Sequence, residues 1–236
     1  MNHNLVVLDP AHGGPDSGVS LGNNVPEKFT TLALAGRLRN ALASSGFTVV
    51  ATRDADSSDP LTTDQRAETA NRTHAVACIV LHATTVGSGV HIYTSTLQPS
   101  DPDTTATPSS AFVPVSWDTA QAASVTQSLR LADDLKAALA RGNLPVQLGK
   151  ASVRPLDNLM CPAVAIEIAP LAAATGESTP DTDANYQQHV ADAVAAALRS
   201  WRTHAEPPAS PQGPTSAATA PPSGAKISPP VKKVPE

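Results

Sequence analysis

Short apolar runs alternate with stretches of helical character along most of this chain, and this alternation limits the folds open to it more than any other feature. Five runs predict buried strands, at residues 4–9, 47–52, 75–82, 90–94 and 163–168. Four other segments predict helices, at residues 27–45, 61–74, 117–141 and 183–203. This order favours an α/β fold in which helices flank a mostly parallel central sheet.

The end of the chain has a different composition. Nine of the 22 prolines lie between residues 207 and 236, among Ala, Ser, Thr and Gly. A segment with so little apolar surface cannot offset the entropy of ordering. We therefore expect a single globular domain at residues 3–204 and a disordered tail or linker at residues 205–236. A Ser/Thr/Pro/Asp-rich loop is expected at about residues 97–115.

Composition excludes several classes of function. The formal net charge of -5 argues against nucleic-acid binding through bulk electrostatics. No apolar run approaches the ~20 residues that span a bilayer. The two cysteines argue against a disulfide framework, a CxxC redox pair and a cysteine-ligated zinc site. We expect Cys78 and Cys161 to be buried free thiols. The N-terminus has no basic segment and no long apolar core, so we expect no signal peptide within this sequence. Either the chain stays in the cytoplasm or its export segment lies outside this sequence.

Polar residues follow the predicted strands at the edge where sites of open α/β sheets form. His12 lies after the first strand, His82 ends the third, Glu167 lies on the last, and Glu27 begins the first long helix. Two histidines and one carboxylate are a common zinc ligand set that leaves a position open for water. A second carboxylate would take the proton of that water. The predicted chemistry is hydrolysis.

Simpler interpretations of these residues stay open. A histidine after a strand is often an ordinary loop residue, and a glutamate at a helix start often only interacts with the helix dipole. Glu167 differs, because an acid among apolar strand residues is costly unless it is paired. His91 is a further candidate, which either lines the cleft or replaces His82 as a ligand.

Seven short blocks resemble, in order, the motifs of the zinc-dependent N-acetylmuramoyl-L-alanine amidases. The first is Val7-Leu-Asp-Pro-Ala-His-Gly-Gly-Pro-Asp-Ser-Gly18, and the last is Cys161-Pro-Ala-Val-Ala-Ile-Glu-Ile168. The others lie at residues 27–34, 52–54, 66–72, 79–83 and 89–93. The resemblance implies that His12, Glu27 and His82 bind Zn²⁺ and that Glu167 is the catalytic base. It also implies cleavage of the amide between N-acetylmuramic acid and L-alanine of peptidoglycan.

The chain departs from the family pattern near the expected cleft. Thr84 replaces the usual Asn, and Ile-Ala-Pro-Leu-Ala at residues 168–172 replaces Gly-Phe-Leu-Ser-Asn. These changes motivate a second hypothesis, a zinc amidase or peptidase that acts on soluble muropeptides. A third is a non-catalytic wall-binding module. The family implies a periplasmic, extracellular or cell-wall location and peptidoglycan as the partner, and we expect a monomer.

Overall fold

The computed structural model describes residues 4–99, 116–173 and 175–205. The predicted tail lies outside the described residues except for its first position, as does most of the predicted loop at 97–115. Within the described part of the chain, no helix is long and apolar enough to cross a membrane.

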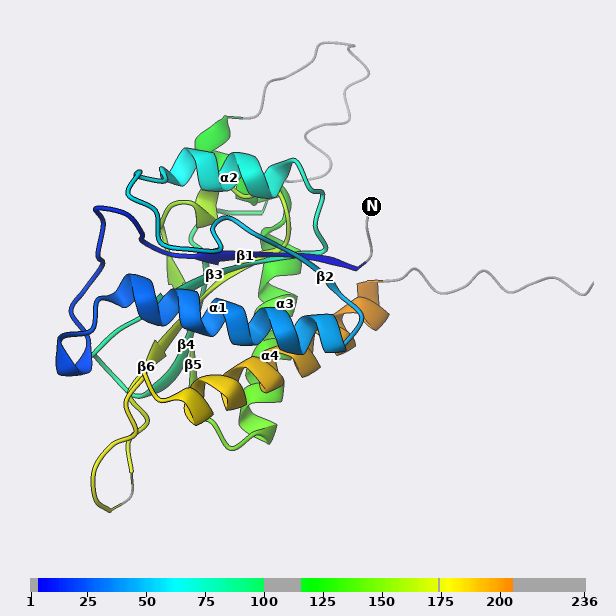
Figure 1. The fold of residues 1–236 in the computed structure, drawn as a ribbon. Coiled ribbons are helices and arrows are strands. Elements are labelled where there is room, and N and C mark those ends of the chain that lie inside the picture. The colour runs from blue at the N-terminus through cyan, green and yellow to red at the C-terminus, as the bar shows by residue number, and fades with distance from the viewer. Residues whose placement is uncertain (1–3, 100–115, 174, 206–236) are drawn as a thin grey trace, which may run out of the picture. The chain divides into compact units, whose positions relative to one another are not determined.

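A six-stranded sheet forms the centre of the domain, with the strand order β2-β1-β3-β6-β4-β5 (Figure 1). Its strands are β1 (Leu5–Pro10), β2 (Thr48–Ala51), β3 (Ala77–Ala83), β4 (Gly89–Ser95), β5 (Val146–Ala151) and β6 (Ala163–Ala169). Four of the five neighbouring pairs are parallel, and only β4 and β6 pair antiparallel. The α/β class with a mostly parallel sheet is therefore confirmed.

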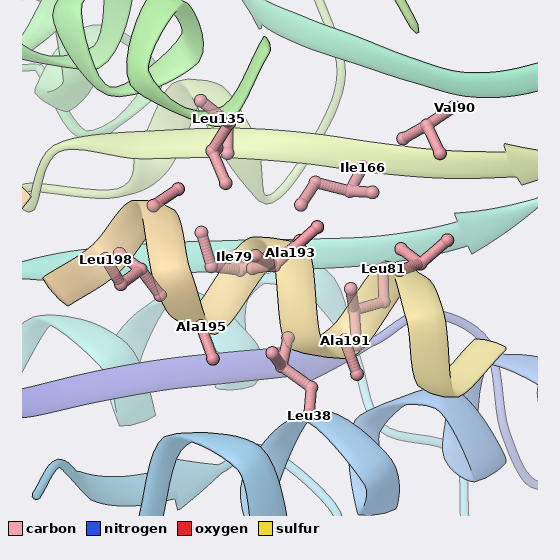
Figure 2. Close-up of a cluster of buried hydrophobic side chains, with 14 of the residues drawn as sticks. Leu38, Ile79, Leu81, Val90, Leu135, Ile166, Ala191, Ala193, Ala195 and Leu198 are labelled. Carbon is pink, nitrogen blue, oxygen red and sulfur yellow. The ribbon is translucent and has the colours of Figure 1, made fainter. Parts of the chain in front are cut away.

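Helices cover both faces of this sheet. On one face lie α1 (Glu27–Ser44), α3 (Val125–Arg141) and α4 (Ala184–Ala205), and on the other lie α2 (Thr63–Asn71) and the short 3-10 helix η4 (Leu156–Asn158). Alternate strand residues point to opposite faces. Ile79 and Leu81 of β3 therefore join the α1/α3/α4 core (Figure 2), while Cys78 and Val80 face α2.

Local signals explain where α1 and α2 begin or end. Helix α1 ends at Ser44, one residue before the predicted end of this helix at residue 45. Gly46, with φ +81°, donates to the Ala43 carbonyl, and Phe47 donates to the Leu42 carbonyl. This is a helix end that favours glycine because the backbone is left-handed. At the start of α2, the side chains of Thr62 and Gln65 cap each other's backbone N–H groups.

The structure differs from the predicted elements at two places. Strand β5 has no counterpart in the sequence analysis, because this edge strand is largely exposed and lacks an apolar run. The predicted helix at 117–141 is instead a 3-10 segment, η3 (Trp117–Ala123), followed by α3. The 3-10 segment ends at Ala123, just before Ser124. Within this segment, the side chain of buried Gln121 donates to the backbone carbonyls of Leu159 and Cys161.

The prediction that both cysteines are free thiols is wrong. Cys78 and Cys161 form a disulfide bond across 83 residues of sequence, with their Cα atoms 6.1 Å apart. The parallel register of β3 and β6 pairs Cys78 with Ala163, which brings Cys161 alongside Cys78. Nothing local in the sequence reports this proximity, because it arises only from strand pairing.

Candidate metal centre

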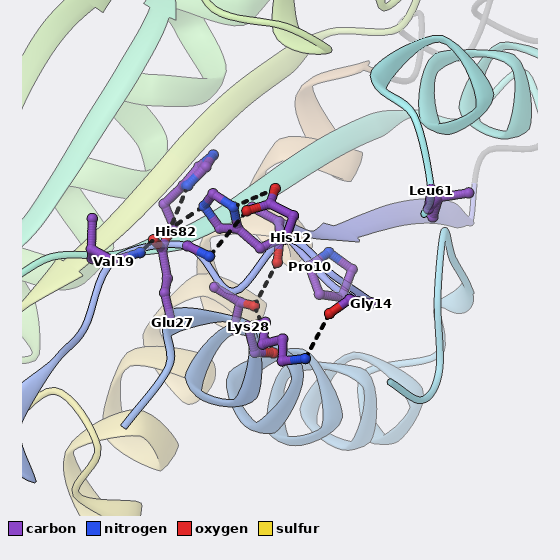
Figure 3. A network of polar contacts seen from close by, with 12 residues as sticks. Pro10, His12, Gly14, Val19, Glu27, Lys28, Leu61 and His82 are labelled. Atoms are coloured by element: carbon purple, nitrogen blue, oxygen red, sulfur yellow. Dashed lines mark hydrogen bonds and ion pairs between the residues drawn. The ribbon is translucent and has the colours of Figure 1, made fainter. Parts of the chain in front are cut away.

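Three predicted ligands meet at the carboxyl end of the parallel strands. His12 follows β1, Glu27 is the first residue of α1, and His82 is near the end of β3. One donor atom from each lies within 4.8 Å of the other two. Figure 3 shows the two imidazole rings and the carboxylate facing one another. The structure thus brings together the three residues that the sequence analysis selected.

Glu27 is the buried centre of this group, with only 3% of its surface exposed. Its Oε2 lies 3.1 Å from Nε2 of His12, and its Oε1 lies 2.9 Å from Nδ1 of His82. The backbone N–H groups of Val19 and Ala83 also donate to the carboxylate, each at 3.1 Å. Burial opposes ionisation of Glu27, but the hydrogen bonds with the two histidines and the two amides outweigh it. The pKa of Glu27 is therefore held well below its usual range.

His12 sits in a left-handed backbone conformation, with φ +63°. The hydrogen bond with Glu27 raises the pKa of His12, although burial acts in the opposite direction. Asp16 adds to this effect, since its Oδ2 lies 2.9 Å from Nδ1 of His12. A carboxylate on one ring nitrogen fixes the orientation of a histidine whose other nitrogen binds a metal.

A buried ion pair supports the turn that carries His12. Arg66 of α2 lies 2.8 Å from Oδ1 of Asp9, and both side chains are 5% exposed. Arg66 also donates to the backbone carbonyls of Pro10 and His12, at 2.8 and 2.7 Å. Arg53 donates to the carbonyls of Pro10 and Ala11. The sequence analysis placed both arginines in family-like blocks but missed this supporting role.

Glu167 lies next to the three-residue group but is not a member of it. It occupies the position on β6 that pairs with His82 on β3, so both side chains point to the same face of the sheet. Its side chain is 27% exposed. His91, the alternative ligand, is not in the group with His12 and Glu27; its Nδ1 instead lies 3.1 Å from Oε2 of Glu167.

The donor set suits a divalent transition metal such as zinc. Two imidazole nitrogens and one carboxylate oxygen are typical of catalytic zinc sites. The ionised state of Glu27 and its backbone hydrogen bonds fit this role, because a metal-binding carboxylate must be deprotonated and oriented.

Comparison with known proteins supports the same family. The family model described as N-acetylmuramoyl-L-alanine amidase matches residues 6–200. The germination-specific N-acetylmuramoyl-L-alanine amidase of Bacillus subtilis is 44% identical over 52 residues, which is 22% of each chain. The amidase AmiA of Escherichia coli is 38% identical over 79 residues, which cover 34% of this chain and 27% of AmiA. The matched segments thus span about a quarter of these relatives.

Solved structures share the fold over a longer range. The amidase Ami1 from Mycobacterium smegmatis aligns with a TM-score of 0.63 and 19% identity, over 85% of this chain and 97% of Ami1. The amidase AmiC2 of Nostoc punctiforme aligns with a TM-score of 0.59 and 24% identity, over 84% of this chain and 96% of AmiC2. The family match over residues 6–200 confirms the family that the sequence motifs predict: this chain belongs to the N-acetylmuramoyl-L-alanine amidase family.

Proposed function

We propose that this protein hydrolyses the amide bond between N-acetylmuramic acid and L-alanine of the peptidoglycan stem peptide. The observation that carries the proposal is the meeting of His12, Glu27 and His82, with Glu167 in the register position beside His82. Metal-assisted amide hydrolysis requires a metal-binding group next to a separate carboxylate, and this arrangement supports that chemistry.

We propose Zn²⁺ as the metal, held by His12, Glu27 and His82. A bound zinc ion would supply Lewis-acid polarisation of the amide carbonyl and activation of a water. The protein's own contribution is to keep Glu27 ionised and buried and to fix the His12 ring through Asp16.

Glu167 is proposed as the base and then the acid. Its carboxylate is partly exposed, so it can reach a water and a substrate in the cleft. It would take a proton from the attacking water and deliver that proton to the nitrogen of the departing L-alanine. Such proton transfer contributes on the order of 10²–10⁴-fold to a rate.

We also propose that the protein acts outside the cytoplasm. Its proposed substrate is the cell wall, and the Cys78–Cys161 disulfide is of a kind that persists in oxidising compartments. The domain bounds stay predictions, with a catalytic domain at residues 3–204 and a tail at 205–236. The monomeric state is also a prediction, which light scattering of the full chain tests.

The test is muropeptide mass spectrometry after digestion of purified sacculi. We compare the zinc-loaded protein, the EDTA-treated protein and Glu167→Ala. The expected result is stem peptides with a free L-alanine amine from the zinc-loaded protein alone. Cleavage of soluble muropeptides but not of sacculi would favour the second hypothesis, for which Thr84 and residues 168–172 are the motive. Intact muramyl–alanine bonds in both substrates would contradict the proposal.

A further inference from the structure

A histidine and a tyrosine on β4 contact the proposed base from the side away from β3. Nδ1 of His91 lies 3.1 Å from Oε2 of Glu167, and the hydroxyl of Tyr93 lies 3.4 Å from the same oxygen. The antiparallel register pairs His91 directly with Glu167. His82, Glu167 and His91 therefore form a row across three neighbouring strands, on the face that α2 covers.

The His91 ring is held in one place. Its side chain is 11% exposed, and it makes an edge-on contact with the Tyr93 ring, with centroids 6.4 Å apart. Gly87, with φ +86°, covers the other end of the imidazole. A Cβ at position 87 would lie 2.6 Å from Cε1 and 2.8 Å from Nε2 of His91. Only a residue without a side chain fits over the ring in this way.

The hydrogen bonding of His91 is one-sided. Nδ1 contacts Glu167, while Nε2 is buried and has no hydrogen-bond partner among the described residues. A neutral imidazole has one N–H donor and one acceptor nitrogen. Because the Glu167 carboxylate can only accept, the N–H is on Nδ1. A buried polar atom without a partner costs stability, so an apolar side chain would suit this position better if packing were its only role.

Tyr93 supplies a second donor. Burial and the nearby Glu167 carboxylate raise the pKa of Tyr93, so its hydroxyl stays protonated at neutral pH. Two donors thus converge on Oε2. No hydrogen bond to Oε1 of Glu167 is found in the described part of the chain, which leaves this oxygen for the proton that is transferred.

We propose that His91 is a positioning residue for Glu167: its Nδ1–H, together with the Tyr93 hydroxyl, holds Oε2 so that Oε1 carries the proton of the reaction. This inference rests on the proposed function, because it assigns His91 a role only through the base.

The experiment compares His91→Leu and His91→Asn in the zinc-loaded full chain, on a muropeptide substrate. Both variants are smaller than histidine, but only asparagine carries an N–H at the place of Nδ1. For His91→Leu we expect kcat to fall ~10–100-fold, the range typical of lost supporting hydrogen bonds. KM, zinc content and melting temperature should not fall. His91→Asn should recover most of kcat. His189→Leu, an exposed histidine on α4, is the matched control.

A double-mutant cycle shows whether His91 acts through Glu167. In the Glu167→Gln background, His91→Leu should cause no further loss of the residual turnover. A wild-type kcat in His91→Leu would overturn the inference, as would an equal loss in His91→Asn or an undiminished further loss in the Glu167→Gln background. Failure of the proposed function looks different, because either the wild type would release no free L-alanine amine or Glu167→Gln would be fully active.

Discussion

His82 and Glu167 are paired across β3 and β6, so a predicted metal ligand and the predicted base are held by the same strand ladder. Backbone hydrogen bonds between central strands are among the most rigid features of a domain. The spacing between His82 and Glu167 therefore depends on the sheet and not on a loop. The position of His12, by contrast, depends on a turn and on the side chains of Arg66 and Asp16 that contact it.

Metal binding should weaken in mildly acidic solution. The Nε2 atom of His12 must be deprotonated to bind a metal, and the neighbouring Glu27 raises the pKa of His12 above its ordinary value of 6.5. Protons should therefore compete with the metal for Nε2 of His12 already at a pH above 6.5. Competitive zinc titration with a chromophoric chelator should show affinity falling by roughly tenfold per pH unit below the raised pKa. A flat affinity from about pH 8 to 6 would contradict this.

Asp16→Asn should weaken metal binding with little effect on folding. The variant loses the negative charge that faces Nδ1 of His12, while the exposed position tolerates the amide. The expected loss of zinc affinity is ~10–100-fold. Asp133→Asn, an exposed position on α3, is the control. Equal zinc affinities in the two variants would show that Asp16 does not orient the ring.

Arg66→Met should destabilise the domain strongly. It leaves the Asp9 carboxylate buried without its ion-pair partner and removes the donor to the His12 carbonyl. Breaking one half of a buried ion pair costs about 3–5 kcal/mol. Urea unfolding measures this loss, and the double variant Asp9→Asn/Arg66→Met should recover part of it. A single variant with wild-type stability would mean that the pair contributes little.

Removal of the disulfide should lower stability and leave the metal centre intact. Disulfide bonds typically contribute about 2–4 kcal/mol to stability, chiefly by restricting the unfolded chain. Cys78→Ala/Cys161→Ala should therefore melt at a lower temperature and still bind zinc. A reductant should lower the melting temperature of the wild type and not that of the variant. If it lowers neither, the cross-link does not form in solution.

The sequence was sufficient to select His12, Glu27 and His82 as members of one candidate group, because each of them is tied to a local signal. His12 and His82 follow apolar runs, and Glu27 begins a periodic helix. The features that the sequence did not predict depend on pairing between distant segments. Strand β5 has no apolar pattern, and the Cys78–Cys161 bond and the His91–Glu167 contact follow from the registers of β6 with its two neighbours. His91 was a candidate by residue type, but its partner was not predictable.

The Cys78–Cys161 bond also affects what a single cut in the backbone would do. Strands β4 and β5 and helix α3 all lie between the two cysteines, as do residues 100–115. Cleavage of one peptide bond anywhere in that interval would leave both fragments in one covalent molecule. On a denaturing gel, a single cut in this interval would therefore separate the two fragments only after the disulfide is reduced.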